Sequence, residues 1–294
     1  MNVNKSFLRF FFINLQEMQD QKKTLFLSYK NHTLPYKKYG FGSEILLAFH
    51  GFGRSGNDFE VFEKDLGQHY TIIAFDFFYH GVNARNLYDP IESFTSSILA
   101  NMLEKLLWEE KKVRFSVIGY SLGAKLVLGI IHRLPHRIYE LFLLAPDGFT
   151  PDYARRILSK TFIGKHISRF AVNNPSAFLA AINASKILGF INEKQQRFFL
   201  MSIKTYEDRK RIYLTWQLLK EYSTHLDLAN HYLKTRPIRF ELFLGKHDQI
   251  IKLSFTDKFM KRLKGKATTH LLDCGHQIFQ KHEEISKIIL QRNF

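Results

Sequence analysis

A serine stands between two glycines in the run Gly119-Tyr120-Ser121-Leu122-Gly123. The run follows an apolar stretch, Val113 to Ile118, and precedes a segment with helical periodicity. A sharp turn from strand to helix would force the serine into strained backbone angles and lift its hydroxyl clear of a sheet. Its close neighbours must then be small. The pattern predicts that Ser121 is a nucleophile, and the helix N-terminus beneath it would favour an oxyanion.

A serine hydroxyl is a weak nucleophile and needs a base whose pKa lies near neutrality. The sequence has 13 histidines, so a histidine alone carries little information. His276, however, follows the last predicted strand, Thr268 to Leu272, and the carboxyl ends of parallel strands meet at one edge of a sheet. We therefore expect His276 to be the base that activates Ser121.

An acid is needed to orient the imidazole and to stabilise its protonated form. Asp248 follows the strand Ile238 to Leu244, and its place gives the chain order Ser, Asp, His. Asp147 follows the preceding strand and is the alternative acid, while Asp273 lies in or beside a strand and is less favoured. We predict Asp248 as the third member of a catalytic triad.

A second glycine-containing run, His50-Gly51-Phe52-Gly53, directly follows the apolar strand Ile45 to Phe49. Acyl transfer requires two hydrogen-bond donors for the developing oxyanion. We expect these donors to be the backbone amides of Leu122 and Phe52. The alternative interpretation is a glycine turn with a structural histidine.

Short apolar runs alternate with amphipathic stretches, which is typical of a mostly parallel sheet flanked by helices. The predicted strands are Leu25–Tyr29 and Leu34–Lys38, forming a hairpin, then Ile45–Phe49, Tyr70–Phe75, Val113–Ile118, Leu141–Leu144, Ile238–Leu244 and Thr268–Leu272. The predicted helices are Ser93–Glu110, Leu122 to about Leu134, and one that begins at Glu283. The expected class is α/β, with a sheet of up to eight strands.

Residues 150–236 show helical periodicity and no clear strand. Asn174-Pro175 has the form of a helix start, a capping residue followed by a first-turn proline. We predict that residues 150–236 form a helical cap inserted between two parts of one core, residues 24–149 and 237–294. Residues 1–23 are expected to be an N-terminal arm or leader, whose apolar part, Phe7 to Leu15, is too short to span a bilayer. No other apolar run approaches transmembrane length.

The composition restricts the partners. Lys and Arg number 43 against 27 Asp and Glu, a net charge of +16, but no zinc finger, RNA-binding motif or long basic run is present, so a nucleic-acid partner is not expected. The single cysteine, Cys274, excludes an intrachain disulfide and favours a reducing, cytoplasmic location. No metal and no cofactor are expected.

Together these runs resemble the α/β-hydrolase superfamily from Leu25 to the C-terminus. The segment Asp76-Phe77-Phe78-Tyr79-His80-Gly81 is similar to the D-x-x-G-H-G segment of that family, with Tyr79 in place of a glycine. We therefore expect this loop to be shaped differently. The resemblance implies a serine hydrolase that acts on a carboxylic ester or thioester through an acyl-enzyme.

The sequence leaves the substrate open. Lys125 occupies the place of the arginine in the S-x-G-G-R run of a menaquinone-pathway lyase, which implies either a site for an anionic substrate or, alternatively, an exposed helical lysine. A lyase or C–C hydrolase and a non-catalytic receptor of the same fold are the other functions considered. The cap begins with basic residues that would suit an acidic acyl carrier protein, as in pimeloyl-carrier methyl esterases, or simply form a solvated face: Arg155, Arg156, Lys160, Lys165 and Arg169. The aromatic residues expected to line an acyl pocket are Phe149, Phe178 and Trp216.

Overall fold

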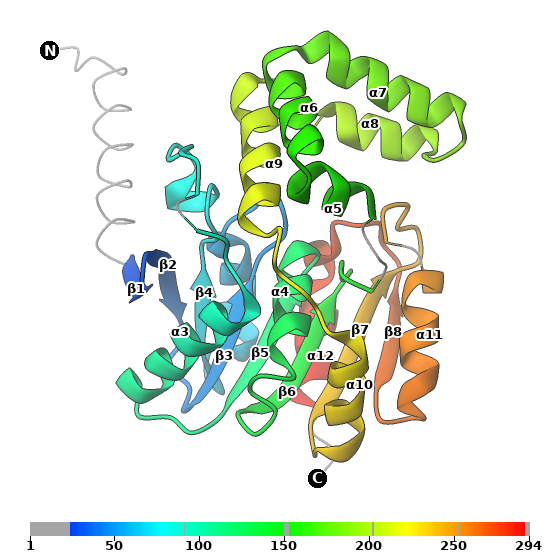
Figure 1. Ribbon diagram of the computed structural model, residues 1–294. Coiled ribbons are helices and arrows are strands. Elements are labelled where there is room, and N and C mark those ends of the chain that lie inside the picture. Colours follow the sequence, from blue (N-terminus) through cyan, green and yellow to red (C-terminus); the bar gives the residue numbers. More distant parts are fainter. Residues whose placement is uncertain (1–23, 91, 150–152, 202, 252, 292–294) are drawn as a thin grey trace, which may run out of the picture.

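Eight strands form one sheet in the computed structural model, which describes residues 24–90, 92–149, 153–201, 203–251 and 253–291 (Figure 1). They are β1 (Leu25–Tyr29), β2 (His32–Tyr39), β3 (Glu44–Phe49), β4 (Tyr70–Phe75), β5 (Phe115–Tyr120), β6 (Ile138–Leu144), β7 (Arg239–Gly245) and β8 (Thr268–Leu272). Their order across the sheet is β1-β2-β4-β3-β5-β6-β7-β8. The pairs β1–β2 and β2–β4 are antiparallel and the other pairs are parallel. The predicted N-terminal arm or leader lies outside the described residues.

Helices cover both faces of the sheet. One face packs against α3 (Ser96–Glu109), α4 (Leu122–Ile130), α10 (Leu226–Thr235) and α11 (Leu253–Leu263), and the other packs against η1 (Gly56–Phe62), α2 (Glu63–Leu66) and α12 (His282–Leu290). Along β3, Leu47 and Phe49 enter the first layer while Leu46 and Ala48 enter the second. Successive side chains of a strand point to opposite faces, so a strand buried on both faces is apolar throughout. The central strands could therefore be predicted from their apolar runs. The predicted α/β class is confirmed.

Between β6 and α10 the chain forms α5 (Tyr153–Lys160), α6 (Phe162–Asn173), α7 (Pro175–Ile187), α8 (Glu193–Met201) and α9 (Tyr206–Leu218). Figure 1 shows these five helices, here called the cap helices, gathered beyond one end of the sheet. As the sequence predicts, α7 begins at the proline after Asn174. The helix α10 instead packs against α4 and α11, with Ala229 and Leu233 buried. The last part of the predicted insertion thus packs with helices that flank the sheet.

The cap helices are joined to the core by specific hydrogen bonds. Arg211 of α9 donates from Nε to the carbonyl of Tyr79, 2.9 Å away, in the loop after β4. The amide of Phe94 donates to the carbonyl of Leu218 at the end of α9, over 2.8 Å. Within the described residues no helix, in the cap or the core, is long and apolar enough to cross a membrane.

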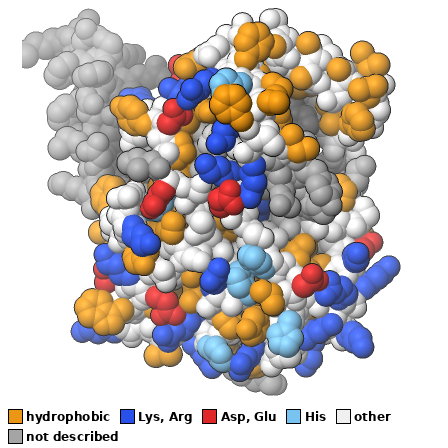
Figure 2. All heavy atoms as spheres, viewed as in Figure 1, with side chains coloured by type: hydrophobic (Ala, Val, Ile, Leu, Met, Phe, Trp, Pro, Cys, Tyr) orange, Lys and Arg blue, Asp and Glu red, His pale blue; other side chains and the backbone are white. Residues whose placement is uncertain are grey.

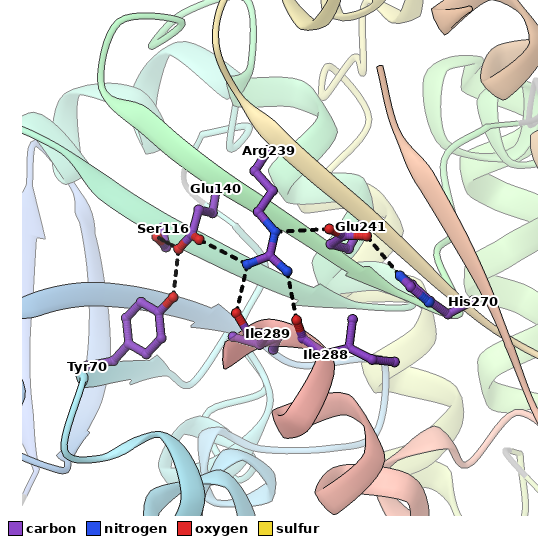
Figure 3. A network of polar contacts seen from close by, with 8 residues as sticks. All are labelled: Tyr70, Ser116, Glu140, Arg239, Glu241, His270, Ile288 and Ile289. Carbon is purple, nitrogen blue, oxygen red and sulfur yellow. Dashed lines mark hydrogen bonds and ion pairs between the residues drawn. The ribbon is translucent and has the colours of Figure 1, made fainter. Parts of the chain in front are cut away.

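A buried carboxylate joins the strands at their amino ends, opposite the turn that follows β5. Glu140 of β6 is almost fully buried and accepts hydrogen bonds from the hydroxyls of Tyr70, at 2.6 Å, and Ser116, at 2.7 Å (Figure 3). Its other oxygen lies 3.3 Å from Nη1 of Arg239. Buried charges require a partner, so this guanidinium compensates Glu140.

Arg239 extends the same network to the last helix (Figure 3). Its Nε lies 2.9 Å from Glu241, and its Nη atoms donate to the carbonyls of Ile288 and Ile289, each over 2.7 Å. The final carbonyls of a helix lack partners within the helix. Arg239 therefore satisfies the end of α12 while neutralising Glu140.

We predict that Arg239→Met destabilises the fold by about 3–5 kcal/mol, because it leaves the carboxylate of Glu140 buried without its cation. Urea unfolding followed by circular dichroism measures the change. The matched control is Arg137→Met, which removes an exposed pair with Glu104 and should cost no more than about 1 kcal/mol. Equal losses in the two variants would contradict this role for Arg239.

Candidate active site

Ser121 stands at the sharp turn between β5 and α4. Its backbone angles are φ 50° and ψ −113°, a conformation that non-glycine residues rarely adopt. The turn is held on both sides, because the Ser121 amide donates to Leu144 of β6 and its carbonyl accepts from the amide of Lys125. The strain expected from the sequence is therefore present at the predicted nucleophile.

The two glycines beside Ser121 are required by close packing. A Cβ atom at Gly123 would overlap the carbonyl of Phe49, at the end of β3, and one at Gly119 would lie 2.7 Å from the Cα of Ala124. Contacts this short do not occur for real Cβ atoms, so a side chain at either position would push α4 away from the sheet. The two glycines are therefore required because α4 begins very close to β3.

His276 and Asp248 lie together on the loops that follow β8 and β7. Nδ1 of His276 is 2.8 Å from Oδ2 of Asp248. The other oxygen of Asp248 accepts from the amides of Ile250, at 2.8 Å, and Ile251, at 2.9 Å, and the carboxylate is fully buried. A carboxylate fixed in this way can accept the Nδ1 proton of an imidazole and leave Nε2 unprotonated.

Tyr120 positions His276 beside the turn, a role that the sequence analysis missed. The Tyr120 hydroxyl donates to the carbonyl of His276 over 3.0 Å, and the two rings are 5.3 Å apart. Burial raises the pKa of Tyr120, so the hydroxyl stays a donor. No sequence signal identifies a hydrogen bond between residues this far apart in the chain.

Asp147, the alternative acid, faces a different partner. Its amide donates to the carbonyl of Ser121, but its carboxylate accepts from the amide of Gly148 and lies 3.7 Å from Nζ of Lys125. Lys125 itself is buried, so the interpretation of it as an exposed helical lysine is wrong. Asp273 is exposed and pairs with His247. The carboxylate beside His276 belongs to Asp248.

The loop after β3 approaches the nucleophile closely. A Cβ atom at Gly51 would lie 3.2 Å from the Cβ of Ser121. Within the described part of the chain, neither the amide of Phe52 nor that of Leu122 has a hydrogen-bond acceptor, so both remain available to a ligand. Leu122 is the first residue of α4, where helix amides are free and the helix dipole favours an anion.

His50 fixes this loop to the next one. The amide of Phe77 donates to Nε2 of His50 over 3.0 Å, and Nδ1 lies 2.7 Å from the carbonyl of Gly51. Burial lowers the pKa of His50, which keeps the imidazole neutral and able to accept from Phe77. His50 is therefore structural, as the alternative interpretation of the run expects, and the oxyanion role of the Phe52 amide stays a prediction.

The loop after β4 is built around Asp76, whose two oxygens accept from the amides of Gly56, at 2.7 Å, and Val82, at 2.9 Å. Tyr79 was expected to change the shape of this loop. It adopts φ 66°, a left-handed conformation that favours glycine, and its carbonyl is held by Arg211. A contact from the cap thus helps a non-glycine residue to occupy this position.

The predicted pocket residues have different environments. Phe149 is buried and packs edge-on against Phe259 of α11, with ring centroids 4.9 Å apart. It belongs to the core rather than to a pocket surface. Trp216 on α9 and Phe178 on α7 are half-buried. Lys160, Lys165 and Arg169 lie on or beside α5 and α6, while the side chains of Arg155 and Arg156 lie outside the described ones.

The family of the alpha/beta hydrolase fold matches residues 44–283, and the chain belongs to it. Relatives found by sequence similarity match a smaller part of the chain. An uncharacterized protein of Mycobacterium tuberculosis is 28% identical over 113 residues, which are 38% of this chain and 32% of that protein. The alignment thus spans about a third of the relative's length.

Solved structures share the whole fold. A hydrolase from Pseudomonas aeruginosa PA01 superposes with a TM-score of 0.63 at 17% identity, over 91% of this chain and 97% of that one. An esterase from Exiguobacterium antarcticum gives 0.61 at 15% identity, over 90% and 97%. A thioesterase domain from the curacin biosynthetic pathway gives 0.56 at 16% identity, over 91% and 98%. At these identities the likeness shows the fold.

His80 makes the stability of the site depend on pH. Burial, together with the nearby His50, lowers the pKa of His80 from 6.5 to about 3. Below pH 6.5 the unfolded chain therefore binds a proton at His80 that the folded protein does not, so stability falls as the pH falls through this window. One such group contributes at most about 1.4 kcal/mol per pH unit.

We predict that His80→Asn, which keeps a donor for the carbonyl of Phe78, reduces the loss of unfolding free energy between neutral and mildly acidic pH. Urea unfolding at each pH measures it. His136→Asn, at an exposed histidine, is the control and should leave the pH dependence unchanged. The same slope in both variants would show that His80 is not the titrating group.

Proposed function

We propose that this protein is a serine hydrolase that cleaves a carboxylic ester or thioester through an acyl-enzyme intermediate. The observation that carries the proposal is the contact between His276 and Asp248, with His276 held by Tyr120, the residue before the strained Ser121. A nucleophile, a base and a buried carboxylate that orients the base form the arrangement that activates a serine hydroxyl.

In the acylation step, Oγ of Ser121 attacks the substrate carbonyl carbon while Nε2 of His276 takes the hydroxyl proton. The carbonyl oxygen becomes an oxyanion that accepts from the amides of Leu122 and Phe52. When the intermediate collapses, the bond to the leaving oxygen or sulfur breaks, and the imidazolium returns its proton to that atom. The buried Asp248 stabilises the imidazolium during this step.

Water completes the cycle. His276 removes a proton from the water as its oxygen attacks the acyl carbon of the ester on Ser121. The second oxyanion uses the same two amides, and its collapse releases the carboxylic acid and restores the serine hydroxyl. No proton or electron pair is needed from outside the residues named and the water.

The cap helices suit a role in substrate selection. The insertion leaves the sheet after β6, at the carboxyl end where the turn at Ser121 lies. We propose that the half-buried Trp216 and Phe178 contact the acyl group, since pockets for such groups are mostly apolar. The pairing of Lys125 with Asp147 does not favour Lys125 as the site for an anionic substrate, as the lyase interpretation would require.

We predict that Ser121→Ala lowers the turnover of a short-chain p-nitrophenyl ester by at least about 10⁴-fold, because binding and the oxyanion hole alone remain. The control is Ser254→Ala, at an exposed serine on α11, which should match the wild type. A panel of esters and thioesters with varied acyl length then defines the substrate.

Near-normal turnover by folded Ser121→Ala protein would contradict the nucleophile assignment. Absence of turnover by the wild type on the whole panel, together with saturable binding of an acyl ligand, would instead indicate a receptor that kept the fold.

A further inference from the structure

Large apolar side chains stand in solvent along one face of α6. Phe162, Ile163, Ile167 and Phe170 are each between 55% and 76% exposed. Their spacing places them, with His166, on one side of the helix, while Gly164 and Val172 are buried on the other. Soluble surfaces carry single exposed apolar residues, but a continuous row of this kind marks an interaction site. We call the four residues the α6 apolar face.

The α6 apolar face is firmly positioned. Arg209 of α9 is buried and donates from Nε to the carbonyl of Val172 over 2.9 Å, which ties the end of α6 to the neighbouring helix. The start of α6 is capped by Thr161, whose hydroxyl accepts from the amide of Gly164. The exposure of the face therefore belongs to a packed helix, held at both ends.

The surroundings of this face are positively charged. From residue 153 to residue 192 the sequence contains no Asp or Glu. Among the described side chains, Lys160 lies directly before α6, and Lys165 and Arg169 lie on it. Figure 2 shows Lys or Arg side chains and a histidine beside hydrophobic side chains over the position of α6. Such a surface complements a negatively charged partner.

Two basic residues on or just before α6 pair with acidic residues of other elements. Arg169 pairs with Asp89 at 3.0 Å, and Lys160 pairs with Glu221 at 2.7 Å. All four side chains are at least one third exposed, so these surface pairs are weak and can be replaced by other anions. The local excess of positive charge therefore remains available to a partner.

We propose that the α6 apolar face docks onto the surface of a lipid bilayer that contains anionic lipids. A helix that presents Phe and Ile to solvent, with Lys and Arg along the flank of that face, can lie in the membrane interface, where rings enter the acyl boundary and cations contact the phosphates. An acidic carrier protein would use the charges but leave the exposed rings in water. The docking is independent of the chemistry proposed at Ser121.

The test uses the full-length chain and sedimentation with phosphatidylcholine vesicles, with and without phosphatidylglycerol. We expect binding that is stronger when phosphatidylglycerol is present. The double variant Phe162→Ser, Phe170→Ser should bind at least about tenfold more weakly, because two rings no longer enter the interface. The double variant Lys165→Gln, Arg169→Gln should lose most of the preference for phosphatidylglycerol, about fivefold for each cation.

The matched control is the double variant Phe41→Ser, Trp108→Ser. It removes two exposed aromatic side chains that lie outside the cap helices, and it should bind vesicles like the wild type. Thermal unfolding shows whether each variant is folded, and ester turnover in the absence of vesicles reports separately on the proposed function. If the wild type binds vesicles but turns over no ester, only the hydrolase proposal is contradicted.

Three results would overturn the membrane proposal. The first is vesicle binding by the Phe162, Phe170 variant equal to the wild type, with only the charge variant affected, as expected for an acidic protein partner. The second is loss of binding on removal of residues 1–17 when the α6 variants still bind. The third is a dimer in solution that Phe162→Ser, Phe170→Ser dissociates, since a second copy would then cover the face.

Discussion

The turn at Ser121 depends on how closely α4 can begin against β3. The carbonyl of Phe49 lies where a side chain at position 123 would be, and the turn at this close approach has Ser121 at φ 50°. The same contact brings the loop after β3 beside the nucleophile, so that Gly51 and the amide of Phe52 share its edge of the sheet. Strained backbone persists only where the surroundings determine it. Here those surroundings are the parallel pairing of β3, β5 and β6, which supplies the acceptor for the Ser121 amide.

The two ends of the strands handle buried charge differently. At the amino ends, Glu140 is neutralised by Arg239 and shared with two hydroxyls, so the network is closed and joins four strands to α12. At the carboxyl ends, Asp248 is held by two amides and faces an imidazole, which can accept a proton. The first arrangement fixes structure. The second leaves one basic nitrogen available, which is the requirement for general base catalysis.

Most of the core could be predicted from the sequence, because strands buried on both faces are continuous apolar runs. Three strands, β1, β4 and β8, have the predicted bounds. The helix α11 was not predicted, since Leu253–Leu263 mixes polar and apolar residues and only Thr256, Phe259 and Leu263 are buried. The sequence predicts that Gly119 and Gly123 must be small, but the atoms that would clash with a larger residue are seen only in the structure. The hydrogen bond from Tyr120 to His276 and the burial of Lys125 depend on contacts between distant segments, and no local pattern encodes them.

The central claim is that Asp248, and not Asp147, orients the base that activates Ser121. The most direct measurement is the rate of covalent labelling by a fluorophosphonate, with the modified residue identified by peptide mass spectrometry. The account predicts an adduct on Ser121, formed about 10³–10⁴-fold more slowly in Asp248→Asn and at nearly the wild-type rate in Asp147→Asn. An adduct on another residue, or a larger loss in Asp147→Asn than in Asp248→Asn, would contradict it.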